Sequence, residues 1–398
     1  MNEFDDIRPF QDSEVPDALA RLISDPELLN LLLSRQFPLL YNVSPILFSA
    51  VARPFLRRHL HSLTKNVSTV SDFQSHMTSR LTEVLRRTTD NYEFSGLEHL
   101  DPDKAYLFMS NHRDIALDPA IVNLGLVNIG RETVRIAIGD NLLSKPFASD
   151  LMRINRSFIV KRSVKTRRDK LDALKMLKLD ALKHLSKYIR QSIKQESVCI
   201  WIAQAEGRAK DGIDKTDTAL LKMLALSKDL DQSFALAARD LNIIPVAISY
   251  EYDPCDSSKA RELHHQKMDL NYTKDPFEDL ESIQKGFVDF KGRISITFGS
   301  PVDDKCDSAD QLAEEIDRQI HLNYKLFPTN IIAWQLQDNQ FQDVHLARLK
   351  NQWPDEDWNA AEISFKTRIN RMPKAHRSIA ISAYAAPVVS QLRYLTDG

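Results

Sequence analysis

The 398-residue sequence predicts an α/β protein with a mostly parallel β-sheet covered by helices and helical extensions at both ends. Between residues 91 and 328, short apolar runs alternate with longer segments of helical pattern, an order typical of βαβ units. Residues 1–90 and 329–398 carry helical patterns without such runs. We therefore expect an N-terminal helical region (1–90), a sheet domain (91–328) and a C-terminal helical appendage (329–398).

The predicted strands are short apolar runs bounded by polar residues. Val198–Ala203 is apolar on both faces, as in a central parallel strand. Pro245 lies near the start of its run, a position that suits the beginning of a strand or a sheet edge. In chain order the predicted strands are Ala105–Met109, Val134–Ile138, Phe158–Val160, Val198–Ala203, Ile243–Tyr250 and Ile294–Phe298.

The N-terminal region combines an apolar run with a basic cluster. Asp25 and Pro26 predict the start of a helix that ends near Arg35. The next 17 residues, 36–52, carry no charge, and basic residues follow between positions 53 and 65. The run is shorter than the ~20 apolar residues that a spanning helix needs. It suits either a helix lying in a membrane interface or a helical pair packed on the core.

Composition limits the classes of partner and compartment. The net charge of −2 gives no overall attraction to nucleic acid, and no nucleic-acid partner is expected. Three scattered cysteines and an acidic N-terminus predict a reducing compartment without a signal peptide, hence a cytoplasmic location. A predicted helix over 165–195 belongs to a segment with twelve Lys or Arg and three Asp between residues 161 and 194. This is either a solvated face or a surface attracted to anionic headgroups.

The stretch from Ser110 to Pro119 holds the first candidate site. His112 comes just after a predicted strand, where the loops of open α/β sheets carry chemistry. Asp118 and Pro119 resemble an N-cap and first turn of the next helix. A histidine and a carboxylate on one loop can form a base and its orienting partner, although a lone His near an Asp is more often structural.

Two further strand ends carry charged residues. Lys161 and Arg162 follow the strand at 158–160, as an anion clamp or as solvated edge charges. Glu206, Gly207 and Arg208 follow the strand at 198–203, where the glycine allows close backbone approach to a ligand. The alternative for this second segment is a turn with an Arg–Glu pair.

The order of these blocks resembles the glycerolipid acyltransferase family, which contains the glycerol-3-phosphate and lysophosphatidate acyltransferases. The resemblance covers roughly residues 95–300 and rests on Asn111-His112…Asp118, Phe158-Ile159-Val160-Lys161-Arg162, Glu206-Gly207-Arg208 and Ile244-Pro245-Val246. The family has four residues between its His and Asp, whereas this chain has five, and Leu117 occupies the family's acid position. Asp118 is our first choice as the orienting acid and Asp114 the second.

The resemblance implies transfer of a fatty acyl group from an acyl thioester, acyl-ACP or acyl-CoA, to the hydroxyl of an anionic lyso-lipid or glycerol phosphate. His112 would be the general base and Asp118 its partner, with the acceptor's anion bound by Lys161, Arg162 and the segment Glu206, Gly207 and Arg208. No metal or redox cofactor is needed. We expect a peripheral protein on the inner face of the membrane. The alternative is a catalytically silent lipid-binding protein of the same fold.

Overall fold

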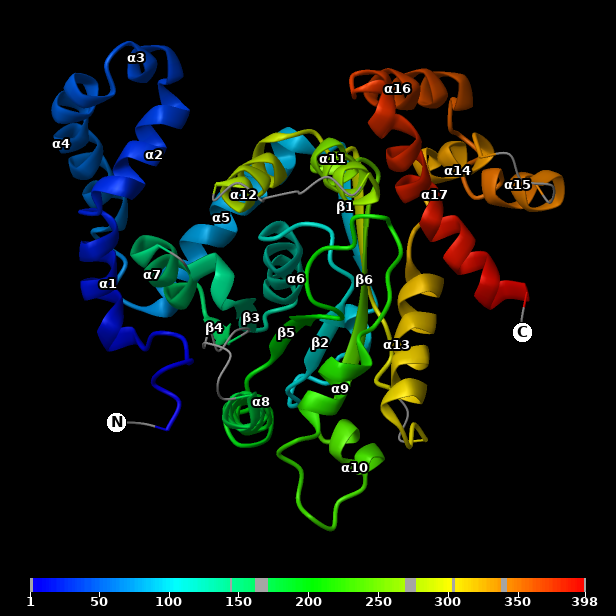
Figure 1. Cartoon of the computed structure of the whole chain (residues 1–398), viewed down its shortest axis with the longest axis horizontal. Helices are drawn as coiled ribbons and strands as arrows, with labels where there is room; N and C mark the ends of the chain where they lie inside the picture. Colours follow the sequence, from blue (N-terminus) through cyan, green and yellow to red (C-terminus); the bar gives the residue numbers. More distant parts are fainter. Residues whose placement is uncertain are drawn as a thin grey trace. The chain divides into compact units, whose positions relative to one another are not determined.

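The computed structural model describes residues 3–143, 145–161, 171–268, 277–302, 305–337 and 342–396. The chain divides into two compact units. The N-terminal unit comprises Met1–Arg80 and Thr133–Ala181, and the sheet unit comprises Leu81–Glu132 and Leu182–Gly398. Figure 1 shows the elements of both, and the predicted mostly parallel α/β fold is confirmed.

The sheet unit contains five of the strands that the structure describes, in the order β1-β7-β6-β2-β5. All neighbours are parallel except β6 and β7. Ser110, the last residue of β2, pairs with Ala203 of β5 and Val246 of β6. The loops that follow β2 and β5 therefore begin at the same edge of the sheet, as the carboxyl ends of parallel strands do. The strands are β1 (Asn91–Ser95), β2 (Leu107–Ser110), β5 (Ile200–Ala203), β6 (Ile243–Tyr250) and β7 (Arg293–Phe298).

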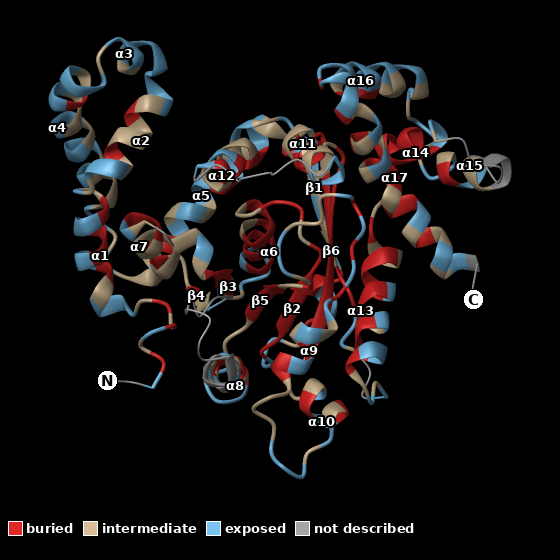
Figure 2. Cartoon of the chain, in the orientation of Figure 1, coloured by how far each residue is buried: buried red, intermediate tan, exposed pale blue. Residues whose placement is uncertain are grey.

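Every predicted strand is present, and β1 is an additional one. Its five residues, Asn-Tyr-Glu-Phe-Ser, alternate between exposed and half-buried positions. The apolar-run criterion missed β1 because its sequence is not an apolar run. Its register comes from pairing with β7, which lies some 200 residues later in the chain. In Figure 2, by contrast, β2, β5 and β6 are almost entirely buried.

The helices of the sheet unit cover the strands and extend to the C-terminus. Helix α6 follows β2 and is buried along most of its length. The helices are α6 (Leu117–Asn128), α9 (Thr218–Leu224), α10 (Phe234–Arg239), α11 (Asp256–Lys267), α12 (Glu278–Val288), α13 (Ala309–Asn323), α14 (Pro328–Gln335), α15 (Gln342–Lys350), α16 (Trp358–Asn370) and α17 (Lys374–Thr396), with a 3-10 turn at Leu97–His99. Helices α5 (Val70–Thr88) and α8 (Leu171–Lys194) each run from one unit into the other.

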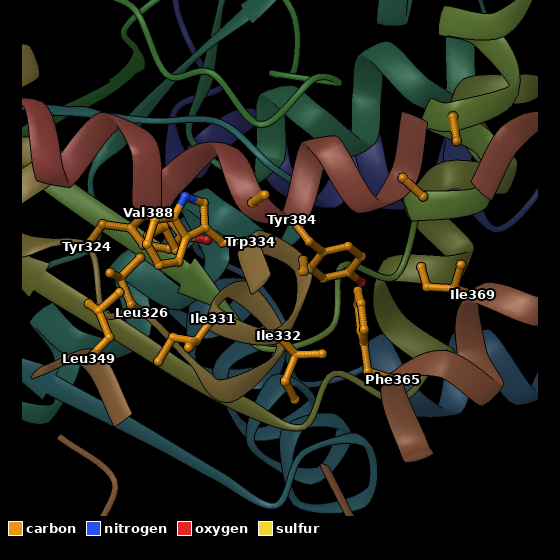
Figure 3. Close-up of a cluster of buried hydrophobic side chains, with 14 of the residues drawn as sticks. Tyr324, Leu326, Ile331, Ile332, Trp334, Leu349, Phe365, Ile369, Tyr384 and Val388 are labelled. Carbon is orange, nitrogen blue, oxygen red and sulfur yellow. The ribbon is translucent and has the colours of Figure 1, made fainter. Parts of the chain in front are cut away.

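The C-terminal helices share a hydrophobic core with other elements of the sheet unit. Figure 3 shows Phe365 of α16 beside Tyr384 of α17, and the two rings meet edge to face with centroids 5.2 Å apart. The same cluster includes Ala260 of α11. The loop after β5 also packs on α17: a Cβ on Gly212, whose φ is +79°, would lie 2.0 Å from the carbonyl oxygen of Ala383. Residues 329–398 therefore help to hold a loop at the carboxyl edge of the sheet.

The N-terminal unit is mainly helical and contains the parallel pair β3 and β4. As predicted, Asp25 caps a helix, because its carboxylate accepts hydrogen bonds from the backbone N–H groups of Glu27 and Leu28. The elements are α1 (Val15–Leu22), α2 (Pro26–Gln36), α3 (Pro38–Val43), α4 (Pro45–Thr64), β3 (Arg135–Gly139), α7 (Pro146–Ile154) and β4 (Ser157–Val160), with 3-10 turns at Asp12–Glu14 and Asp140–Leu143.

Helices α3 and α4 expose large apolar side chains, and both are mostly pale blue in Figure 2. Leu39, Val43 and Ile46 are 83%, 85% and 83% exposed, and Phe55 is 73% exposed. We call residues 37–55 the exposed apolar segment. In the described part of the chain, no helix combines the length and hydropathy required to cross a bilayer.

Candidate active site

Asn111 determines where the chain leaves the sheet after β2. Its side-chain Oδ1 accepts a hydrogen bond of 2.8 Å from the backbone N–H of Ile248, and its Nδ2 donates one of 3.0 Å to the carbonyl of the same residue. The side chain thus takes the place of a backbone partner for β6. Because the ladder is completed in this way, the backbone can turn at His112 without leaving buried polar groups of β6 unpaired.

His112 and Asp118 form a hydrogen-bonded pair. Imidazole Nδ1 lies 2.9 Å from Asp118 Oδ2, and the Asp118 carboxylate is completely buried. The same oxygen accepts hydrogen bonds from the backbone N–H groups of Arg113 at 2.6 Å and Asp114 at 2.9 Å. The five-residue spacing is accommodated because the loop curls around the carboxylate and directs two N–H groups at it.

Asp114, the second-choice acid, has a different place. Its Oδ1 accepts hydrogen bonds from the N–H groups of Ala116 and Leu117, which open α6. The prediction that Asp118 caps this helix is therefore wrong: Asp118 lies inside the first turn, and Asp114 supplies the acceptor. Burial, and then the nearby Asp118, raise the pKa of Asp114 to about 6.

The residue after His112 links this loop to the rest of the sheet unit. Arg113 is buried, and its Nη2 donates to Asp214 Oδ2 at 2.7 Å. Its backbone carbonyl accepts a hydrogen bond of 2.7 Å from Nζ of Lys259 on α11. The N–H of Ala209, in the loop after β5, donates to the carbonyl of His112 at 2.9 Å. The backbone carbonyls of His112 and Arg113 are thus held by other elements.

Trp201 of β5 forms one wall beside the imidazole. The two rings meet edge to face, with centroids 5.6 Å apart. The indole N–H donates to the hydroxyl of Ser110 at 3.0 Å, which fixes the ring. The His112 side chain remains 14% exposed. Because an ionised carboxylate only accepts hydrogen bonds, Nδ1 is the protonated nitrogen and Nε2 of the neutral ring can accept a proton.

The other predicted site residues that the structure describes lie in two places, the loop after β5 and the N-terminal unit. Glu206 and Gly207 are exposed in the loop after β5, and Gly207 has a φ of +81°, a backbone conformation that favours glycine. Arg208 is half-buried and donates to the hydroxyl of Ser282 on α12 at 3.3 Å. Lys161 is exposed in the N-terminal unit and pairs with Asp6 there. Arg162 lies outside the described residues.

Sequence reasoning missed two side chains that contact the His–Asp pair. Trp201 lies within a predicted strand but was interpreted only as core. Tyr250, the last residue of β6, donates its hydroxyl to Asp118 Oδ1 at 2.8 Å. A polar aromatic residue closing a mostly apolar strand was the available signal. Its partner depended on the β2–β6 register, which the sequence pattern does not specify.

A buried carboxylate–histidine pair after a parallel strand is typical of α/β enzymes that use acid–base chemistry. Residues 91–249, which contain the pair and all four motif blocks completely, match the model of the Acyltransferase family. This part of the chain therefore matches an acyltransferase domain, as the motif resemblance predicted.

The search of solved structures identifies the 1-acyl-sn-glycerophosphate (LPA) acyltransferase PlsC from Thermotoga maritima. The sequence identity is 12% and the TM-score 0.36, with coverage of 77% of this chain and 94% of that one. The comparison with curated proteins finds no match.

Proposed function

We propose that this protein transfers a fatty acyl group from an acyl thioester to the hydroxyl of an anionic lyso-lipid or glycerol phosphate. The donor would be acyl-ACP or acyl-CoA. The observation that carries the proposal is the 2.9 Å contact between His112 and the buried Asp118 inside the acyltransferase domain. The name of the similar solved enzyme mentions the same substrate class, which is why a glycerolipid acceptor is the first to test.

The proposed reaction begins with proton transfer to His112. Nε2 takes the proton of the acceptor hydroxyl as that oxygen attacks the thioester carbonyl carbon. The tetrahedral intermediate then collapses, the carbon–sulfur bond breaks, and the imidazolium returns the proton to the leaving sulfur. Asp118 holds Nδ1–H throughout and stabilises the imidazolium. The product is an ester, and the donor leaves as a free thiol.

The acceptor's anion requires cations, and we propose two sets of residues to test: Arg208 with the exposed Glu206–Gly207 turn in the sheet unit, and Lys161 with its sequence neighbour Arg162 in the N-terminal unit. A guanidinium matches phosphate oxygens with a planar fork of donors. Arg208 bonds Ser282 in the structure, so it would exchange this hydroxyl for the acceptor. Arg162→Ala should mainly raise the Michaelis constant for the acceptor, and impaired donor affinity instead would move Arg162 to the donor side.

We also propose that the protein binds peripherally to the cytoplasmic face of a membrane. The exposed apolar segment is followed by exposed Arg57, Arg58 and Lys65. Apolar side chains at the acyl boundary with cations at the headgroups are typical of interfacial helices. This arrangement would bring a lipid acceptor to the enzyme without a spanning helix.

The decisive experiment is an acyl-transfer assay on the purified full-length chain. Lysophosphatidate, glycerol 3-phosphate and an aminoacyl lyso-lipid would each be tested with acyl-ACP and acyl-CoA, beside the His112→Ala variant. We expect turnover with at least one pair, reduced ~100-fold or more in the variant, as for a lost general base. If vesicles bind but no pair is turned over, the catalytically silent lipid-binding alternative replaces the proposal.

A further inference from the structure

We propose that Tyr250 is a positioning residue of this active site, whose hydroxyl holds the Asp118 carboxylate in the orientation that presents one oxygen to His112. The proposal rests on the proposed role of His112 as the base. It adds a residue that lies outside the four motif blocks and more than 130 positions from the histidine.

The two oxygens of Asp118 have unequal surroundings. Oδ2 accepts hydrogen bonds from His112 and from two backbone N–H groups. Oδ1 accepts its hydrogen bond from the Tyr250 hydroxyl, at 2.8 Å. Tyr250 is 3% exposed and Asp118 is fully buried, so bulk water does not compete for this bond. Removing the hydroxyl would leave a buried anionic oxygen without this donor and the carboxylate held through Oδ2 alone.

The chemistry of Tyr250 suits a permanent donor. Burial, and then the charges of Asp118 and Asp114, raise its pKa well above 10. The phenol therefore keeps its proton throughout the pH range in which an imidazole titrates. It can support the carboxylate without exchanging a proton with it.

The Asn111 side chain fixes the position of the Tyr250 ring, and it also lets the chain turn into the catalytic loop, residues 111–116 between β2 and α6. Asn111 pairs with Ile248, two residues before Tyr250, which locks this end of β6 to the residue preceding His112. The hydroxyl and the imidazole therefore approach Asp118 from two elements whose register is set by one asparagine.

Other charged groups also face the pair. Arg113 and Asp114 come from the catalytic loop and interact electrostatically with Asp118. Arg208 from the loop after β5 and Lys291 from the segment before β7 interact with Asp114. Asp253, after β6, adds to the field at Tyr250. None of these is altered by replacing the tyrosine hydroxyl, so a change in the pH profile can be attributed to the lost donor.

The test is Tyr250→Phe in the full-length enzyme, with the substrate pair identified by the acyl-transfer assay. We expect kcat to fall ~10-fold or more, as for loss of a hydrogen bond to a charged group, while both Michaelis constants stay unchanged. The acid limb of the pH–rate profile should move upward by roughly half a unit, because Asp118 without this donor attracts the imidazolium more strongly.

Tyr384→Phe is the matched control. Its buried hydroxyl bonds the carboxylate of Asp256 at 2.9 Å, which the structure places on α11. This control should lose thermal stability and leave the pH profile in place. If Tyr250→Phe behaves like the control, or lowers kcat without moving the acid limb, the positioning role is overturned.

Two additions complete the test. His112→Ala distinguishes failure of the proposed base from failure of the positioning role. Normal turnover in that variant refutes His112 as the base. A large loss in that variant, together with normal turnover in Tyr250→Phe, refutes only the positioning role of Tyr250. If Tyr250→Phe fails to fold, 3-fluorotyrosine at position 250 keeps the hydroxyl and makes it a stronger donor. The acid limb should then move downward, and an unchanged or upward-moving limb would overturn the proposal.

Discussion

The loop between β2 and α6 and the exposed apolar segment depart from the ordinary distribution of residues in opposite ways. Proteins usually bury apolar side chains and leave charged ones in water. The loop and the first turn of α6 bury Arg113, Asp114 and Asp118, whereas the segment leaves Val43 and Ile46 more than four-fifths exposed. Both arrangements cost stability, and both therefore indicate function.

The two regions differ in what compensates the cost. The buried loop is compensated from within: Asp118 receives hydrogen bonds from two backbone N–H groups, an imidazole and a phenol. Such a network has a single geometry, as a catalytic site requires. Apolar side chains in water have no such internal compensation, and burial against a bilayer would lower their free energy. The buried loop thus favours a catalytic role, and the exposed apolar segment favours binding to a membrane surface.

The largest expected effect separates the two acids of the loop. Asp118→Asn should reduce kcat at least ~100-fold, because an amide presents the wrong partner to His112 Nδ1 and to the surrounding donors. Asp114→Asn should reduce it less than ~10-fold, since the amide oxygen can still accept from Ala116 and Leu117. Steady-state kinetics on both variants, with circular dichroism to verify folding, measure the difference. The opposite ranking would make Asp114 the orienting acid.

The extent of sequence prediction in this loop follows from the range of each interaction. His112 and Asp118 could be paired from the motif, because both lie within seven residues. The part played by Asp114 could not, since one inserted residue changes which carboxylate faces the helix N–H groups. The contacts of Tyr250 and Trp201 could not be predicted from the sequence either, because they depend on strand order and register across more than 80 residues. The assignment of Arg208 to the acceptor's anion, or to an Arg–Glu pair in a turn, likewise did not include its hydrogen bond to Ser282, which α12 supplies from a distant part of the chain.

The next prediction measures how much unfolding free energy the burial of the Asp114 carboxyl costs. Asp114 has a pKa of about 6 against an ordinary 3.8, and no hydrogen-bond partner for its Oδ2 lies among the described residues. Between these values the folded state binds more protons than the unfolded state, so stability falls as pH rises. The full shift of about 2 units corresponds to about 3 kcal/mol.

Asp114→Asn removes this titration. Relative to the native protein, the variant should gain up to about 3 kcal/mol in unfolding free energy between pH 4 and 7. Chemical denaturation of both proteins at several pH values measures the gain, and other titrating carboxylates cancel because both proteins contain them. A difference that stays constant with pH would show that Asp114 is not ionising in a buried site.

In the N-terminal unit the sequence predicts the local features but not their packing. The sequence indicated the apolar run, the basic cluster and the Asp25 cap, all of which depend on neighbouring residues. It left open whether the run packs on a core, and the exposure of α3 and α4 favours the interfacial alternative. The basic helix was predicted over 165–195. The structure describes it from Leu171, with its Leu185 and Tyr188 buried, while residues 162–170 lie outside the described residues.

The smallest expected effect tests the exposed apolar segment directly. Val43→Ser and Ile46→Ser together should weaken binding to vesicles containing anionic lipid by ~30-fold, or about 2 kcal/mol, because two partly inserted aliphatic side chains are lost. Co-sedimentation measures this, and the melting temperature should be unchanged because neither side chain is buried. Ile363→Ser with Val389→Ser is the matched control, since these exposed residues lie on α16 and α17 of the sheet unit.

Binding of the native protein to the vesicles should also weaken as salt rises, because the cations at 57, 58 and 65 are exposed and charges are screened beyond ~10 Å at roughly 0.1 M. If both double variants bind equally well, or if the native protein does not pellet with vesicles at low salt, the segment does not contact the membrane and must be covered by protein instead.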